Sequence, residues 1–299
     1  MGRVIMSKSS NVVERIASRT NTGLAADTVA RITWGCIATP GDLEVGALIR
    51  ERGASDALQL VLTAAKKFAD GFDLNAIRSR LTPRTTSSVR VCLECAEANG
   101  FVPLTPLDRW WPARVDALGD AAPLLLWLDG RISDLAREPV AVVGVENLTV
   151  YGTRGALALT AGIVGRGWAA VTSTDTGAAE CVRAAAVKEG GSSITVSACG
   201  LDQVEIFEGG SVVSEYPIGS RQSAWKQLRS YRLIAALSSQ TVIVEPEIAS
   251  PVLTVADQAV RLGRPVGIVE PDHARRGSDR FARWFGARPV QTFNDLLPL

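Results

Sequence analysis

Four side chains in the segment WKQLRSYRLIAALS, residues 225–238, are of the types that bind a nucleic-acid strand. They are Lys226, Arg229, Tyr231 and Arg232, and an apolar run follows them directly. Cations neutralise backbone phosphates, and an aromatic ring stacks on a base. This combination at the start of a predicted helix is one that a surface for single-stranded DNA could use.

The same residues also fit an ordinary amphipathic helix. Arg229 and Arg232 are three positions apart, so they can pair with acids on a solvated helix face. Trp225 and Tyr231 can equally be part of a core. The net charge of the chain is only +1, so a local patch, and not the overall field, would have to attract DNA. On the residues alone, both interpretations stay open.

Metal binding and catalysis find little support in the sequence. Cys92 and Cys95 form one CxxC pair, His273 is the only histidine, and a structural zinc ion needs four ligands. Asp202 and Glu245 follow predicted strands, where we favour turn and capping roles over a catalytic pair. We therefore expect no metal, no cofactor and no catalytic residue, so that the protein is not an enzyme.

The elements that must position these side chains fall into two regions. Residues 1–100 place apolar side chains at helical spacing, with a break at Pro40-Gly41-Asp42, and predict a small helical domain. Residues 101–139 are rich in proline and tryptophan at their start and are interpreted as a connector and entry segment. Within 101–299, short β-branched runs then alternate with helical stretches, which predicts an α/β, Rossmann-like, mostly parallel sheet with flanking helices.

The strands and helices of this sheet are predicted as follows. Strands are expected in 140–145, 168–173, 193–200, 211–217, 241–247 and 265–271. Helices are expected in 151–167, 177–191, 231–238, 250–263 and 278–288.

The carboxyl ends of the predicted strands share one edge, where such sheets bind ligands. These ends are rich in glycine, serine and threonine, and lie at Gly144, 172–175, 198–202, 214–220 and 245–250. Helix N-terminal amides at such turns suit phosphate, although the same residues also make tight turns. Five such turns on one edge favour a binding surface.

The chain shows no secretory apolar core and no apolar run of the ~20 residues that span a bilayer. Its five cysteines are scattered, which indicates reduced thiols. We expect a cytoplasmic protein without membrane association.

Several segments, taken in order, resemble the DprA/Smf family of DNA-processing proteins. They are PVAVVGVENLTVYG (139–152), ACGLD (198–202), SEYPIGS (214–220), LRSYRLIAALS (228–238) and VIVEPEIASPVLTVADQAVRLGRPVGIV (242–269). The segment VARITWGCIATPGDLEVGALI (29–49) resembles the sterile-alpha-motif-like domain that precedes the α/β domain in the family. From the resemblance we expect no C-terminal winged helix, which some members have.

The resemblance implies a function and a site. Family members bind and protect single-stranded DNA, help to load the RecA recombinase during natural transformation, and form homodimers through the α/β domain. The nucleic-acid-binding residues that the resemblance implies are Gly144, Arg154, Gly177, Lys226, Arg229, Tyr231, Arg232 and Ser250.

The sequence also departs from the family pattern at this site. Glu146 stands where the family has an arginine, TSTDTGAAECVR (172–183) replaces a glycine-rich loop, and Pro251 removes a backbone donor. One interpretation is a remodelled DNA surface supplied by Arg154, Lys226, Arg229, Arg232, Arg275 and Arg276. The alternative is a nucleotide-sensing or partner-binding module that has lost DNA binding.

Overall fold

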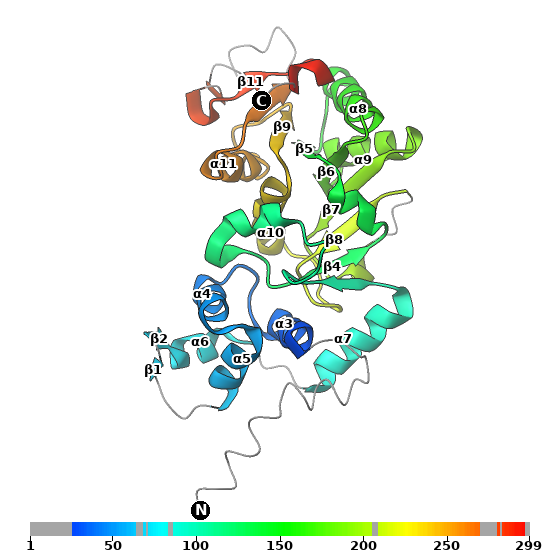
Figure 1. Ribbon diagram of the computed structural model, residues 1–299. Coiled ribbons are helices and arrows are strands. Elements are labelled where there is room, and N and C mark those ends of the chain that lie inside the picture. The colour runs from blue at the N-terminus through cyan, green and yellow to red at the C-terminus, as the bar shows by residue number, and fades with distance from the viewer. Residues whose placement is uncertain are drawn as a thin grey trace, which may run out of the picture.

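The computed structural model of the protein describes residues 26–63, 68–69, 71–82, 86–204, 209–269, 280–281 and 283–296. A large α/β part carries a smaller group of N-terminal helices at one end (Figure 1). Among the described residues, no helix combines the length and the apolar character needed to cross a bilayer.

The N-terminal part is helical, as its apolar spacing predicts. Its elements are α3 (Ala26–Ile37), α4 (Leu43–Arg52), α5 (Ala54–Thr63), β1 (Phe68–Ala69), β2 (Phe72–Asp73), α6 (Leu74–Arg80) and α7 (Thr86–Asn99). The predicted break falls between α3 and α4, where the Asp42 side chain caps α4. It accepts the amides of Glu44 and Val45 at 3.1 and 3.2 Å.

The α/β part is built on a nine-stranded sheet in the order β11-β10-β9-β5-β6-β7-β8-β4-β3. The strands are β3 (Val102–Leu104), β4 (Leu126–Asp129), β5 (Pro139–Gly144), β6 (Ala169–Ser173), β7 (Ser192–Ser197), β8 (Ser211–Ser214), β9 (Gln240–Val244), β10 (Val266–Val269) and β11 (Arg288–Pro289). The crossover helices are α8 (Val150–Gly165), α9 (Ala178–Lys188), α10 (Ala224–Leu237) and α11 (Leu253–Arg261).

Strands β5 to β11 pair in parallel, so the predicted mostly parallel sheet is confirmed. The chain adds β6, β7 and β8 on one side of β5, and then returns to add β9 on the other side. The boundary between the neighbouring strands β5 and β9 is therefore the topological switch point of the sheet, where open α/β sheets bind ligands.

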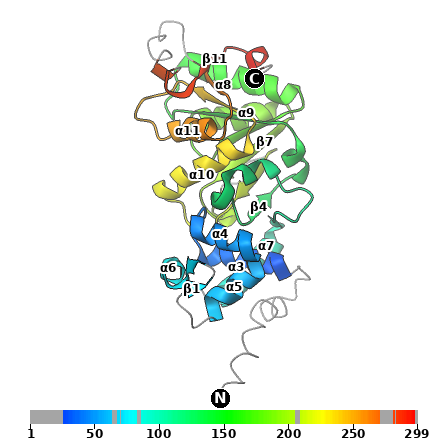
Figure 2. The same cartoon turned by 60° about the vertical axis from the view of Figure 1, so that its left-hand side comes forward.

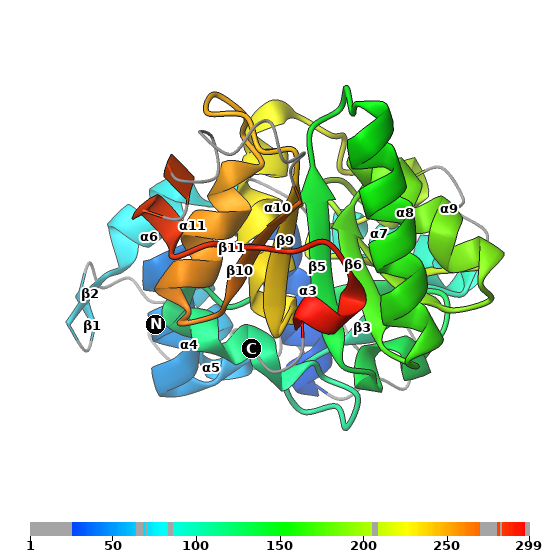
Figure 3. The ribbon, with the colours of Figure 1, turned by 90° about the horizontal axis from the view of Figure 1, so that it is seen from above.

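Alternate residues of β5 enter two different cores, because successive side chains of a strand point to opposite faces. Val140 and Val142 pack with α8 and α9, while Ala141 and Val143 pack with α10 and α11. Figure 3 shows the two helix pairs on the two sides of the sheet. The result is a three-layer α/β/α arrangement.

The segment 101–139 is more than the connector that the sequence suggests. Its strand β4 pairs antiparallel with β8, and β3 pairs antiparallel with β4, so the segment extends the sheet to its edge. The 3₁₀ helices η1 (Ala113–Ala121) and η2 (Ile132–Ala136) flank β4. Strand β3 has three residues and β4 has four, and prolines stand close to both. Such short strands show too little alternation of apolar and polar residues to be predicted from the sequence.

The N-terminal helices share a core with the edge of the sheet. Leu125 and Trp127 from the β4 region, with Ile218 from the loop after β8, pack with apolar residues of α3 to α7 such as Trp34. Figures 1 and 2 show these helices below β4 and α10.

Candidate functional site

A pocket of about 410 Å³ lies at the switch point of the sheet. The loops after β5, β6 and β9 and the N-terminal half of α10 form its wall. The lining residues are Gly144, Val145, Glu146, Asn147, Asp175, Ala224, Gln227, Leu228, Tyr231, Glu247, Ala249, Ser250, Pro251 and Val252.

The wall of the pocket is acidic. Glu146, Asp175 and Glu247 contribute carboxylates, and its described lining contains no lysine or arginine. A phosphate needs cationic or amide donors, and carboxylates repel it. The pocket is therefore unsuited to a phosphate group.

The N-terminus of α8 is capped by a carboxylate of the protein. Glu245, just after β9, accepts the Thr149 amide at 2.8 Å and the Thr149 hydroxyl on its other oxygen. The Thr149 hydroxyl in turn accepts the amides of Tyr151 and Gly152 at 3.2 Å. An anion at a helix N-terminus is favourable, and here the glutamate takes the place that a phosphate would need.

The N-terminus of α9 is closed as well. The Gly177 amide donates to the Glu180 carboxylate at 3.2 Å, and the Ala178 amide donates to the Val145 carbonyl at 3.2 Å. Below this turn, buried Arg183 donates to the carbonyls of Ser173 and Asp175 at 2.6 and 3.0 Å. Burial lowers the pKa of the Arg183 guanidinium. Its donors hold the turn and do not enter the pocket.

Gly144 and Gly177 are required by close packing. A Cβ at Gly144 would lie 2.5 Å from the Val244 carbonyl oxygen. Gly177 has a φ of +68°, and a Cβ there would lie 2.1 Å from the Glu146 carbonyl oxygen. Both glycines therefore set the shape of the pocket wall.

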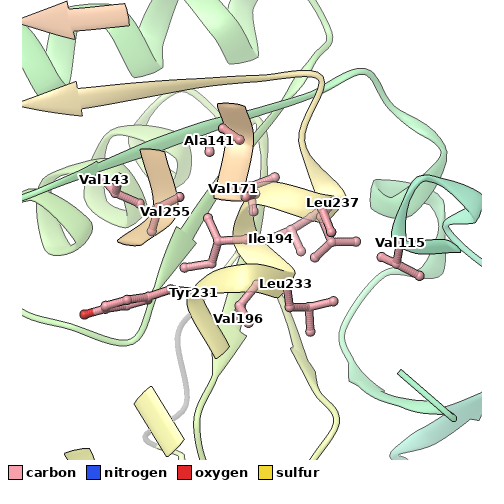
Figure 4. Packing of buried hydrophobic residues seen from close by; sticks show 14 of the residues in the cluster. Val115, Ala141, Val143, Val171, Ile194, Val196, Tyr231, Leu233, Leu237 and Val255 are labelled. Carbon is pink, nitrogen blue, oxygen red and sulfur yellow. The ribbon is translucent and has the colours of Figure 1, made fainter. Parts of the chain in front are cut away.

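Tyr231 is buried at the bottom of the pocket. Figure 4 shows its ring beside the apolar side chains of the core, with its hydroxyl directed away from them. The hydroxyl donates to Asp175 at 3.0 Å, and Gln227 donates to the same carboxylate. Burial, followed by the charges of Asp175 and Glu146, raises the pKa of Tyr231. The ring is thus a structural part of the wall and is not exposed for stacking.

Arg232 is buried away from the pocket. Its guanidinium forms two bonds with Glu215, with Nη1 to Oε1 at 2.5 Å and Nη2 to Oε2 at 2.7 Å, and also donates to the Ala121 carbonyl at 3.2 Å. Burial opposes the charged form, but the charge and hydrogen bonds of Glu215 outweigh it and raise the pKa of Arg232. Its donors are used within the protein.

The remaining cations of α10 lie closer to solvent. Arg229 is half-buried and donates through Nε to the Pro40 carbonyl. The Lys226 ammonium donates to the Ser220 hydroxyl and the Arg221 carbonyl, both at 2.6 Å, and lies 5.3 Å from the centre of the Tyr216 ring. These contacts hold the first turns of α10 against the preceding loop.

Two exposed residues here were not among the predicted site residues. Arg221 is exposed in the loop before α10. Trp225 on the first turn of α10 is 51% exposed, and its ring is nearly perpendicular to that of Tyr216, with 6.5 Å between the ring centres. The sequence did point to Trp225, because it is the first residue of the segment 225–238 in which a DNA surface was considered. Its exposure, however, depends on tertiary packing.

The structure brings together only part of the predicted binding edge. The ends of β5, β6 and β9 form the pocket, with Ser250 in its wall. The turns at 198–202 and 214–220 do not line it. Instead, Asp202 joins the two turns by accepting the Gly219 amide at 2.8 Å, whereas Glu245 has the predicted capping role at the start of α8.

The other candidate residues are placed apart from the pocket. Arg154 is exposed on α8, and Cys92 is buried in the core of the N-terminal helices. Arg275, Arg276 and His273 lie outside the described residues.

A doubly wound sheet with a pocket at its switch point defines a Rossmann-like α/β protein. The family model for DNA recombination-mediator protein A matches residues 103–298, and the chain belongs to this family. The recognised DprA/Smf resemblance is thereby confirmed.

Curated relatives match at moderate identity. A putative DNA processing protein DprA of Mycobacterium tuberculosis is 31% identical over 199 residues, which are 59% of this chain and 51% of the relative. Protein Smf of Escherichia coli is 28% identical over 175 residues, which are 54% of this chain and 46% of the relative. The chain spans about half the length of the curated relatives that it matches.

Two solved structures share the fold. DNA processing protein A from Streptococcus pneumoniae has a TM-score of 0.67 at 20% identity, covering 92% of this chain and 97% of its own. DNA processing protein A from Helicobacter pylori has a TM-score of 0.57 at 20% identity, covering 65% of this chain and 93% of its own. The second structure is described as showing a single-stranded DNA binding mode of that protein.

Proposed function

We propose that this protein is a single-stranded DNA-binding protein of DNA processing, and not an enzyme. Its membership of the recombination-mediator family and its fold similarity to the Helicobacter pylori protein support the proposal. The acidic switch-point pocket does not suit phosphate, so we look for the DNA surface outside its lining.

The surface that fits DNA best is the start of α10, which we call the α10 surface. It comprises Arg221, Trp225, Lys226 and Arg229. The observation that carries the proposal is the half-exposed indole of Trp225, which follows Arg221 by four residues in the sequence and directly precedes Lys226. Base stacking on an aromatic side chain with nearby cations is the usual, sequence-tolerant mode of single-strand binding.

Each residue has a distinct expected role. Trp225 stacks on a base, while the charges of Arg221 and Lys226 neutralise phosphates of the strand. Arg229 holds the helix against Pro40 through Nε. Affinity then depends on salt because bound counterions leave the strand.

The test is fluorescence anisotropy of a labelled oligothymidine at two salt concentrations. Trp225→Ala should weaken binding by about tenfold, since one stacked base is worth about 1–3 kcal/mol. Arg221→Ala should lower the slope of log affinity against log salt by about 0.7, the value for one phosphate of a single strand. Trp284→Ala is the matched control, because Trp284 is 49% exposed and does not belong to the α10 surface.

An equal loss of affinity for oligothymidine in Trp225→Ala and Trp284→Ala would rule out the α10 surface as the DNA site. No binding of the wild type at low salt would rule out the DNA function and favour the partner-binding alternative. A nucleotide sensor gains less support, because carboxylates stand where its phosphates would bind.

Two further roles belong to the same proposal. As a recombination mediator, the protein would help to load the RecA recombinase onto the strand in the cytoplasm, during recombination or natural transformation. It would also form a homodimer through the α/β part. Strand-exchange assays with RecA and light scattering of the purified protein test these roles separately.

A further inference from the structure

The switch-point pocket is organised to receive positive charge. Three carboxylates face it, and no cation belongs to its described lining. At the same edge of the sheet, the N-termini of α8 and α9 are capped by Glu245 and Glu180, so their partial positive charges are already compensated. The three carboxylates would repel an anionic ligand.

The three carboxylates of the wall are not equivalent. Asp175 already accepts from the hydroxyls of Ser173 and Tyr231, at 2.7 and 3.0 Å, and from Gln227. Glu146 and Glu247 are exposed, and no ion pair of the described residues includes either of them. These two glutamates, from the loops after β5 and β9, are therefore available to a cation from outside.

The carboxylates do not form a metal site. Within the described residues, no group of three histidine, cysteine, aspartate or glutamate side chains is arranged to hold a metal ion. The volume of about 410 Å³ also exceeds what a single ion fills, and suits an organic cation or a side chain.

The border of the pocket is apolar. Leu228 in its wall is 44% exposed, and Ile248, between Glu247 and Ala249 of the wall, is 56% exposed. Pro251 and the buried Val252 are further apolar residues of the lining. Exposed apolar residues next to unpaired charges are typical of protein interfaces, whereas a free polyamine would gain little from them.

We propose that this pocket is a docking site for a basic, partly apolar segment of a partner protein. A lysine or arginine side chain of the segment enters beside Glu146 and Glu247, and a neighbouring apolar side chain packs on Leu228 and Ile248. Charge complementarity selects the partner, and the apolar contact distinguishes it from a small amine. The inference does not depend on DNA binding at the α10 surface.

The probe is a fluorescein-labelled peptide of alternating leucine and arginine, measured by anisotropy against the full chain. It should bind at least tenfold more tightly than a leucine–glutamate peptide and than a serine–arginine peptide of the same length. The double variant Glu146→Lys/Glu247→Lys should lose at least tenfold in affinity, and Glu146→Gln/Glu247→Gln several-fold.

The matched control is Glu94→Lys/Glu97→Lys, which reverses two exposed glutamates of α7. It should keep the affinity within twofold. Equal loss in both lysine variants would show non-specific attraction and overturn the site. Equal affinities for the serine–arginine and leucine–arginine peptides would show that the apolar contact contributes nothing. That result would overturn docking of a partly apolar protein segment in favour of a small cation.

The same variants separate this inference from the proposed function. Charge reversal at Glu146 and Glu247 should raise the affinity for oligothymidine while it lowers the affinity for the peptide. Loss of peptide binding with DNA binding intact would therefore support the docking site alone. Intact peptide binding in Glu146→Lys/Glu247→Lys would overturn it, whatever the DNA result.

Discussion

Arg232 and Glu215 form a bidentate ion pair, with nitrogen–oxygen distances of 2.5 and 2.7 Å, in the interior where α10 meets the end of β8. The resemblance to DNA-processing proteins implies a DNA-binding arginine at this position. Here its guanidinium instead joins α10 to Glu215 and to the Ala121 carbonyl. The cation therefore stabilises the fold.

Removing one partner of this pair should be costly, because the other charge stays buried without compensation. We expect Arg232→Met to lower the free energy of unfolding by about 3–5 kcal/mol. The double variant Arg232→Met/Glu215→Leu should recover most of that loss, since an apolar pair can replace a buried ion pair. Urea denaturation of the two variants measures both values.

The matched control is the exposed pair of Arg261 and Asp257, at 2.8 Å on α11. Arg261→Met should change stability by less than about 1 kcal/mol. An Arg232→Met variant as stable as Arg261→Met would contradict the structural role of the buried pair.

Glu245 should stabilise the start of α8. Glu245→Gln keeps the size of the side chain but removes its charge from Thr149 and the helix N-terminus. We expect a loss of about 1–2 kcal/mol in the free energy of unfolding. Glu247→Gln, two residues further on and outside any ion pair of the described residues, should stay within about 0.5 kcal/mol. Equal effects in the two variants would argue against the cap.

Gly177 should tolerate no side chain. Gly177→Ala places a methyl group against the Glu146 carbonyl oxygen at a φ of +68°, and we expect a loss of about 3 kcal/mol. Gly190→Ala has a similar φ of +63° but open space around it, so about 1 kcal/mol is expected. The difference between the two in thermal or urea unfolding isolates the contact with Glu146.

Asp295 should make stability depend on pH. Hydrogen bonds from the amides of Thr292 and Gln291 lower the pKa of this carboxyl below its usual value. Its contribution is present above the unfolded pKa of about 3.9 and is lost as the pH falls through the lower folded pKa. Asp295→Asn should therefore be less stable than the wild type at pH 7, with a difference that shrinks below about pH 4.

The alternation of strands and helices after residue 140 is readable in the sequence because each buried strand is a short β-branched run. The prediction of a strand at 140–145 differs by one residue from β5. Strands β3 and β4 were not predicted, because an edge strand depends on pairing with its partner more than on its own sequence pattern. The pairing of β4 with β8 joins residues about 85 positions apart.

The site was less predictable for the same reason. In the segment 225–238, the sequence shows the types of the four candidate side chains but not the residues that they contact. Glu215, Ala121 and Pro40 occupy the donors of Arg232 and Arg229 from distant parts of the chain. Glu146 is the exception, because the sequence alone shows a carboxylate at a turn where the family has an arginine, and such a charge repels phosphate whatever the packing.

The shared core between α3 to α7 and the edge of the sheet means that the N-terminal helices cannot be detached without damage. Cutting the chain near residue 100 would uncover Leu125, Trp127 and Ile218. A truncated α/β fragment should thus aggregate, and the intact chain should melt in a single cooperative transition. Limited proteolysis should yield whole protein and small peptides, with no long-lived fragment between them.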